Sequence, residues 1–122
     1  MGLNEIVDFS TAKLLKEKGF DKPTPKYFRY DGKECENKPI NWNEDVGFFS
    51  RPTIADVIMW LYEKHSIFIT VTIPYSEFGK FSAEIWGKES ANIKILLVDG
   101  MSVFNTINQA YEEGIIESLK LI

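Results

Sequence analysis

The most regular alternation of side chains in the chain runs through Ile67-Phe68-Ile69-Thr70-Val71-Thr72-Ile73. Ile and Val occupy every second position, and Phe and Thr fill the positions between them. Because successive side chains of a strand point to opposite faces, this pattern predicts a β-strand with one strongly apolar face. Pro74 follows directly and ends the strand, since proline cannot donate a ladder hydrogen bond.

Two further strands are expected after this one, over 81–86 and 93–98. The turn between them runs from Gly87 to Asn92, and such short connections favour an antiparallel meander. The apolar face predicted for this meander carries Ile67, Ile69, Val71, Ile73, Phe81, Ala83, Ile85, Ile93, Ile95 and Leu97.

Two helices on either side of the meander in the sequence are expected to cover that face. The first begins after Thr53, with Asp56 in the position that completes a capping box. The helical period places Ile54, Val57, Ile58, Leu61 and His65 on one side of it. The second begins after Thr106, with Gln109 at the capping-box position. Its predicted stripe is Ile107, Ala110, Tyr111, Gly114, Ser118 and Leu121.

The N-terminal part predicts a short helix and a hairpin. The helix begins at Asp8 or Ser10 and runs to Lys18, and Gly19 is suited to the position after its end. A hairpin over 27–42 follows, with strands at 27–30 and near 39–42, and Phe48-Phe49 leads into the next helix. The expected fold is α+β, a helix plus hairpin followed by α-β-β-β-α. We expect a single domain over 1–122, with 1–50 packed on 51–122.

Composition limits the function classes. The chain has 122 residues, 44% of them hydrophobic, and a net charge of −4. A mildly acidic protein is poorly suited to non-specific nucleic-acid binding, which depends on neutralising phosphates. Cys35 is the only cysteine, so no internal disulfide can form. With no apolar leader or membrane segment at its start, the chain is expected to be cytoplasmic, without contact to a membrane.

The second face of the meander is the main question that the sequence raises. It carries the mixed set Phe68, Thr70, Thr72, Ser82, Glu84, Trp86, Lys94, Leu96 and Val98. The favoured interpretation is that the N-terminal segment packs over part of this face, since large exposed apolar patches are rare on monomers. The alternative is that it binds a partner or a second copy. Met59 and Trp60 raise the same question, and burial under the N-terminal hairpin is favoured for them.

No residues form a recognisable catalytic, cofactor or metal site. His65 and Cys35 are distant in the sequence, and a structural role is expected for the histidine. A possible cation or paired-carboxylate set, Glu34, Glu36, Glu44 and Asp45, lacks any fixed ligand spacing. Glu112-Glu113 is expected to be a solvated helix face. We therefore expect a protein that is not an enzyme and needs no cofactor.

The order α-β-β-β-α is also that of double-stranded RNA-binding domains. Those domains grip phosphates with lysines at the start of the last helix, and residues 102–109 contain no Lys or Arg. The electrostatics thus argue against that function. A nucleic-acid accessory protein is kept as an alternative, with a local basic face made of Lys13, Lys16, Lys18, Lys22, Lys26 and Arg29.

Three segments together resemble a known group of proteins. They are 11–20, then Pro52-Thr53 opening a Trp-containing helix that ends in Glu63-Lys64-His65, and then 110–122. They are similar to short uncharacterised proteins of anaerobic gut bacteria and of their prophages and phages. The resemblance implies an origin and no activity, so no site residues follow from it.

The leading hypothesis is a small non-enzymatic protein-interaction module, associated with phages or mobile elements. It would use aromatics on the open sheet face or near Met59 and Trp60 to bind an unknown protein partner or a second copy of itself. An exposed apolar patch or a symmetric interface is expected on this hypothesis.

Overall fold

The structure is a computed structural model that describes residues 5–72, 81–89, 92–98, 104 and 106–122, without the side chains of 72, 88–89 and 92–98. The predicted α+β class is confirmed. The elements are α1 (Phe9–Glu17), β1 (Thr24–Arg29), β2 (Glu34–Ile40), the 3-10 helix η2 (Trp42–Glu44), β3 (Phe48–Ser50), α2 (Ile54–His65), β4 (Ile67–Thr72), β5 (Ser82–Glu89), β6 (Asn92–Val98) and α3 (Ile107–Leu119). No helix in these ranges is long and apolar enough to span a bilayer.

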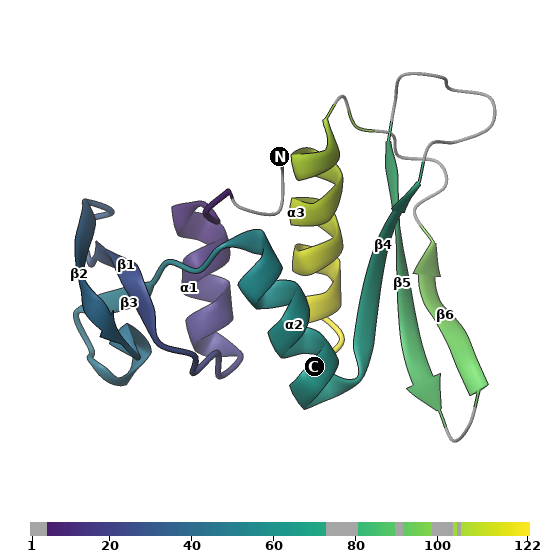
Figure 1. The fold of residues 1–122 in the computed structure, drawn as a ribbon, viewed down its shortest axis with the longest axis horizontal. Coiled ribbons are helices and arrows are strands. Elements are labelled where there is room, and N and C mark those ends of the chain that lie inside the picture. Colours follow the sequence, from purple (N-terminus) through teal and green to yellow (C-terminus); the bar gives the residue numbers. More distant parts are fainter. Residues whose placement is uncertain (1–4, 73–80, 90–91, 99–103, 105) are drawn as a thin grey trace.

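The helices form a layer between two antiparallel sheets (Figure 1). The second sheet has the order β4-β5-β6 and is the predicted meander. The first has the order β2-β1-β3, so the predicted hairpin gains a third strand. That strand is β3, which pairs Phe49 with Phe28 of β1. Phe48-Phe49 therefore does not simply lead into α2, and Trp42 belongs to η2 instead of the hairpin's second strand.

The capping residues predicted for the helices are present. Asp8 accepts from the backbone N–H of Thr11 at the start of α1, and Gly19 has φ +93° after its end. Thr53 and Asp56 form the reciprocal capping box of α2. Thr106 accepts from the backbone N–H of Gln109 at the start of α3. These bonds satisfy amides that the helices themselves leave unpaired.

One continuous hydrophobic core joins the three layers. It runs from Phe28 of β1 through the helices to Ile85 of β5, and both of these side chains are buried. The core members from the helices and from the segments between elements are Val7, Ala12, Leu15, Phe20, Ile54, Val57, Trp60, Leu61, Ile115 and Leu119. Ile67, Ile69 and Ala83 bring the inner face of the second sheet against α2 and α3, as the alternation predicts.

The described part of residues 1–50 does not cover the other face of the second sheet. Figure 1 places β1, β2 and β3 on the opposite side of the helix layer. The favoured prediction for this face is therefore wrong. The reason is that α1 and the first sheet find their apolar partners on α2 and α3, whose surfaces are wide enough to pack on both sides.

Several details of the predicted faces need correction. Trp60 is buried as predicted, at 2% exposed, and packs on Phe20. Met59 is 50% exposed, so its predicted burial is wrong. Leu121 is 49% exposed because α3 ends at Leu119, which takes its place in the core. The pairing of β5 with β6 shifts in register between Ile85 and Trp86. The predicted alternation of inward and outward side chains is therefore interrupted at this point of the β5–β6 pair. Ile73 and the side chains of Ile93, Lys94, Ile95, Leu96, Leu97 and Val98 lie outside the described part.

Gly114 is a glycine in the interior of α3, and its surroundings explain it. A β-carbon at this position would lie 2.8 Å from Cγ2 of Ile69 and 3.5 Å from the β-carbon of Ala83. The absence of a side chain lets α3 pack closely on β4 and β5. Glycine in a helix interior costs about 1 kcal/mol relative to alanine, and this close packing compensates for that cost.

We predict that Gly114→Ala destabilises the protein despite its better helix propensity. The added methyl group meets Cγ2 of Ile69, a β-branched side chain with little freedom in a strand. A net loss of about 1–3 kcal/mol in the free energy of unfolding is expected from overpacking, measured by urea titration. Gly47→Ala is the control, since nothing lies within 4 Å of its added β-carbon. Equal stability of the two variants would contradict this account of the helix–sheet contact.

Candidate functional site

Four large apolar side chains form a strip at the surface near the end of α2, which we call the apolar strip: Met59, Tyr62, Phe68 and Trp86. Met59 and Tyr62 of α2 are 50% and 47% exposed. The ring of Tyr62 lies 4.6 Å from that of Phe68, between centroids. Phe68 of β4 is directly paired with Trp86 of β5, and both are half-buried. The strip therefore continues from a helix across two strands.

The apolar strip is exposed because the opposite sides of the same elements are used by the core. In α2, Ile54, Val57 and Leu61 are fully buried, whereas Met59 and Tyr62 are neighbours three residues apart on the other side. In β4, Ile67 and Ile69 point into the core, so the alternation directs Phe68 to the other face. The indole N–H of Trp86 donates to Oγ1 of Thr70 at 3.1 Å, which fixes the ring on this face.

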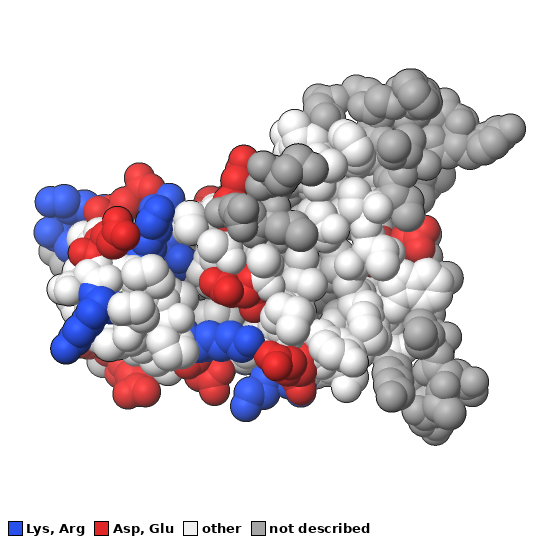
Figure 2. Space-filling view, viewed as in Figure 1, with Lys and Arg blue, Asp and Glu red and all other residues white. Residues whose placement is uncertain are grey.

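Charge is distributed unevenly over the surface. In Figure 2, Lys and Arg gather over the first sheet and α1, interleaved with Asp and Glu. Between these charges and the second sheet the surface is mostly white, although α2 itself carries the exposed residues Asp56, Glu63 and Lys64. A sparsely charged surface that contains exposed aromatic side chains is typical of a protein-binding region.

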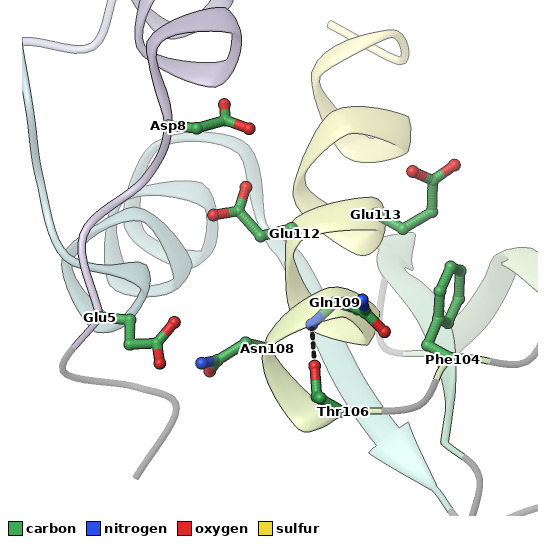
Figure 3. A pocket seen from close by; sticks show the side chains of 8 residues that line it. All are labelled: Glu5, Asp8, Phe104, Thr106, Asn108, Gln109, Glu112 and Glu113. Carbon is green, nitrogen blue, oxygen red and sulfur yellow. Dashed lines mark hydrogen bonds between the residues drawn. The ribbon is translucent and has the colours of Figure 1, made fainter.

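A second feature is an acidic cavity where the starts of α1 and α3 lie close together (Figure 3). Its volume is about 690 Å³. Glu5 and Asp8 precede α1, and Asn108 and Glu112 face them from α3. The complete lining is Glu5, Asp8, Phe104, Thr106, Asn108, Gln109, Glu112 and Glu113. Asp8 is already used as the cap of α1, so it contributes negative charge to the cavity without being free to move.

Glu112 is the carboxyl group most affected by this arrangement. Burial, together with the negative charges of Asp8 and Glu5, raises its pKa to about 7. The hydroxyl of Thr11 donates to its Oε2 at 3.1 Å, which acts in the opposite direction. The prediction that Glu112 is simply solvated is therefore wrong. The spacing of Glu112 with Ile115 and Leu119, both fully buried, is the sequence signal for an inward position.

The described residues of the acidic cavity offer only carboxyl groups for proton transfer. A carboxyl group with a pKa near neutrality is suited to proton transfer, but the cavity lining includes no histidine or cysteine that would act with it. Within the described ranges, no group of three or more Asp, Glu, His or Cys side chains is arranged to hold a metal ion.

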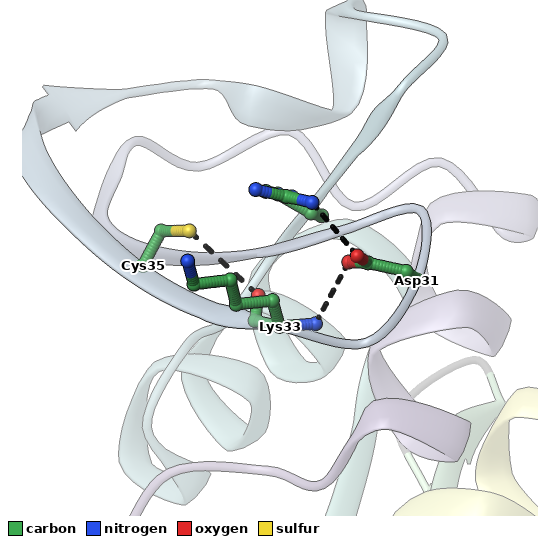
Figure 4. Close-up of polar contacts among 4 residues, drawn as sticks. Asp31, Lys33 and Cys35 are labelled. Atoms are coloured by element: carbon green, nitrogen blue, oxygen red, sulfur yellow. Dashed lines mark hydrogen bonds and ion pairs between the residues drawn. The ribbon is translucent and has the colours of Figure 1, made fainter.

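The other residues considered for chemistry lie apart from one another. His65 packs edge-on against Trp60, with centroids 4.9 Å apart, at the end of α2. Cys35 lies in β2 opposite Tyr27 and contacts the carbonyl of Lys33 at 3.8 Å (Figure 4). Histidine and cysteine thus occupy different layers of the molecule, and no Cys–His pair forms.

The turn before Cys35 is held by Asp31. Its carboxylate accepts from the backbone N–H of Lys33 at 3.1 Å and from Arg29 at 2.8 Å (Figure 4). The backbone bond, followed by Arg29, lowers the pKa of Asp31. These contacts stabilise the β1–β2 turn, in which Gly32 has φ +86°. The polar side chains of Arg29 and Asp31 therefore have a structural role in this turn.

The carboxylates of 34–45 do not converge. Glu34 pairs with Arg51, and Glu44 accepts from the side chain of Asn41 at 3.5 Å. Glu36 lies exposed in β2, and Asp45 follows η2, where its backbone carbonyl accepts from Lys16. These four residues therefore contact different parts of the molecule and do not form a paired or cation-binding site.

The cations proposed as a basic face are mostly engaged within the molecule. Lys22 pairs with Glu63 at 2.7 Å, and Arg29 pairs with Asp31. The remaining contacts are those of Lys13 over the ring of Phe9, Lys16 with the carbonyl of Phe48 and Lys18 with the carbonyl of Ile122. These contacts connect segments that are distant in the sequence. Figure 2 also shows acidic side chains among the basic ones. The basic side chains on this surface are therefore interrupted by acidic ones, and the nucleic-acid alternative stays a prediction.

Comparisons of the chain with protein-family models, with curated proteins and with solved structures found no match.

We predict that Glu112→Gln removes a pH dependence of stability. Because the folded state raises the pKa of Glu112 from 4.5 to about 7, it binds more protons than the unfolded chain between these values. The contribution of Glu112 to the free energy of unfolding is then fully present below pH 4.5 and is lost as the pH rises to about 7. Water still reaches part of the carboxyl group, so at pH 8 the variant should gain about 1–2 kcal/mol.

The test is urea unfolding from pH 4.5 to 8. Glu113→Gln, the neighbour on α3, makes the same change of formal charge without contacting Thr11, and it should keep the slope of the wild-type profile. A pH profile of Glu112→Gln that runs parallel to that of the wild type would show that contact with α1 does not raise the pKa of Glu112.

Proposed function

We propose that the chain is a non-enzymatic protein-interaction module that binds a protein partner through the apolar strip. The observation that carries this proposal is that the exposed side chains of Met59 and Tyr62 continue into the half-buried Phe68 and Trp86 across α2, β4 and β5. Large aromatic side chains at such positions are the residues that contribute most to protein–protein binding energy.

The apolar strip contributes little to folding and leaves apolar area free for a partner. Met59 and Tyr62 keep about half of their surface in water, so the folded chain gains little from burying them. The ring contact of Tyr62 with Phe68 and the hydrogen bond of Trp86 to Thr70 hold the aromatic rings in place before any partner arrives. A surface that is organised in advance loses less conformational entropy on binding.

The acidic cavity is less suited to be the functional site. Its carboxylates lie beside no described group that would complete a catalytic pair. The alternative of a nucleic-acid accessory protein is less favoured, because two of its six cations, Lys22 and Arg29, are paired with carboxylates and acidic side chains lie among the basic ones. An association with phages or mobile elements stays a prediction of the sequence resemblance.

The proposal is tested by site-specific photo-crosslinking in cells of the native host. A photoreactive phenylalanine analogue replaces Met59, and Tyr62→Ser is introduced into the same chain. We expect an adduct from position 59 that falls at least about tenfold with Tyr62→Ser, because an aromatic anchor contributes about 2 kcal/mol or more. The stability should change by less than about 1 kcal/mol, since the tyrosine is half exposed.

The matched control places the analogue at Tyr30, which is 73% exposed and lies in the turn after β1, a strand of the other sheet. An adduct from position 59 that depends on Tyr62 and does not form from position 30 supports the proposal. Equal adducts from both positions, or a yield that Tyr62→Ser leaves unchanged, would overturn it.

A further inference from the structure

The second sheet presents a strand edge beside the apolar strip. β4 pairs with β5 along Ile67–Thr72 on one side, and it is the outer strand of the order β4-β5-β6. On its other side, no residue of the described ranges forms a strand pair with it. The backbone N–H and C=O groups on that side are a template for one more strand.

The edge of the first sheet provides an instructive comparison. β2 is also an outer strand, but it carries Glu34, Glu36, Lys38 and Pro39. Charged residues and proline are the usual means by which an outer strand avoids pairing with another chain. β4 has none of them, since its sequence contains only Ile, Phe, Thr and Val. Of these two outer strands, β2 is thus protected by its composition and β4 is not.

The composition of β4 also fits a partner with the same sequence. When a strand pairs antiparallel with its own copy about a two-fold axis, every side chain lies near a symmetry-related one. Like charges directly opposite each other would be destabilising, and β4 carries no charge. Threonine and β-branched residues are favourable in cross-strand pairs. Thr70, near the middle of the strand, is exposed and faces Glu84 within its own sheet.

The surroundings of this edge are compatible with a second protein surface. α2 leads into β4 through the single residue Ser66, so Tyr62 packs on Phe68 next to the strand. The near part of the sheet shows few charges (Figure 2), and the charged side chains beside it belong to α2. Two copies joined at β4 would bring their Tyr62 and Phe68 side chains close to the new contact and bury part of both strips.

We propose that the partner is a second copy of this chain, which pairs antiparallel with β4 and joins the two β4-β5-β6 sheets into one continuous sheet. The inference rests on the proposed function and names its partner. Main-chain hydrogen bonds hold the two copies together, and the apolar strips on either side of the two-fold axis add buried area.

Sedimentation velocity over a wide range of concentration tests this inference. The wild type should show a reversible monomer–dimer equilibrium. Thr70→Lys and Thr70→Glu should each weaken dimerisation at least about tenfold, because the substitution places like charges near each other across the axis. An equal mixture of the two variants should restore the dimer, since opposite charges then meet. Restoration also shows that both variants are folded.

Two matched variants separate the edge from other causes. Thr70→Val removes the hydroxyl that Trp86 contacts but adds no charge, and it should leave the dimer intact. Asn37→Lys places the charge on the outer strand β2 and should also have no effect. A dimer that persists in Thr70→Lys and Thr70→Glu would overturn the assignment to β4.

A wild type that stays monomeric at the highest concentration would overturn the second copy as partner. The crosslinking result separates this failure from that of the proposed function. A monomer whose position 59 still forms an adduct with another protein, dependent on Tyr62, would retain the interaction module and change only its partner. A monomer without such an adduct would overturn both.

Discussion

At Gly114 the backbone of α3 comes so close to the second sheet that a β-carbon there would lie 2.8 Å from Cγ2 of Ile69. This approach fixes α3 on β4 and β5, and the other side of the helix then faces α1. The bond from Thr11 to Glu112 spans that seam, and α1 in turn supports the first sheet through Phe9, which packs on Phe28 and Phe49. The order of the layers follows from this close contact between helix and sheet.

A helix layer that serves two sheets leaves their outer faces without a helix. The first sheet partly covers its own outer face, because η2 folds back and stacks Trp42 on Tyr27 with centroids 3.9 Å apart. The indole N–H of Trp42 donates to the carbonyl of Thr24, which holds this cover in place. The second sheet has no comparable segment among the residues that the structure describes. Its outer face therefore keeps Phe68 and Trp86 half exposed, and this difference between the sheets is the physical basis of the proposed function.

Local signals in the sequence were sufficient for the elements and for much of the core. The capping residues Asp8, Thr53 and Thr106 mark helix starts correctly because a cap depends on residues within one turn. The alternation of Ile67 and Ile69 identifies the buried face of β4 for the same reason. Gly114, by contrast, could be recognised only as unusual, since its explanation involves side chains of β4 and β5 that are distant in the sequence.

The functional features were harder to predict because they depend on how the layers are placed. A strand as short as β3 gains its identity from pairing with β1, and the composition of Phe48-Phe49 does not distinguish it from a helix start. The adjacent carboxylates Glu112 and Glu113 predict a solvated face, whereas contact with α1 determines the burial of Glu112. Which side of the helices the first sheet occupies depends on long-range packing, and this choice decides whether Phe68 and Trp86 are covered.

The central claim is that Trp86 lies on an uncovered sheet face while Trp60 lies inside the helix layer. The most direct test labels the complete chain with 5-fluorotryptophan and follows its three resonances by fluorine NMR as a soluble paramagnetic quencher is added. Each resonance is assigned by a single Trp→Phe variant. We expect strong broadening for Trp86 and little for Trp60 or Trp42, which are 2% and 8% exposed. Protection of Trp86 equal to that of Trp60 would contradict the account.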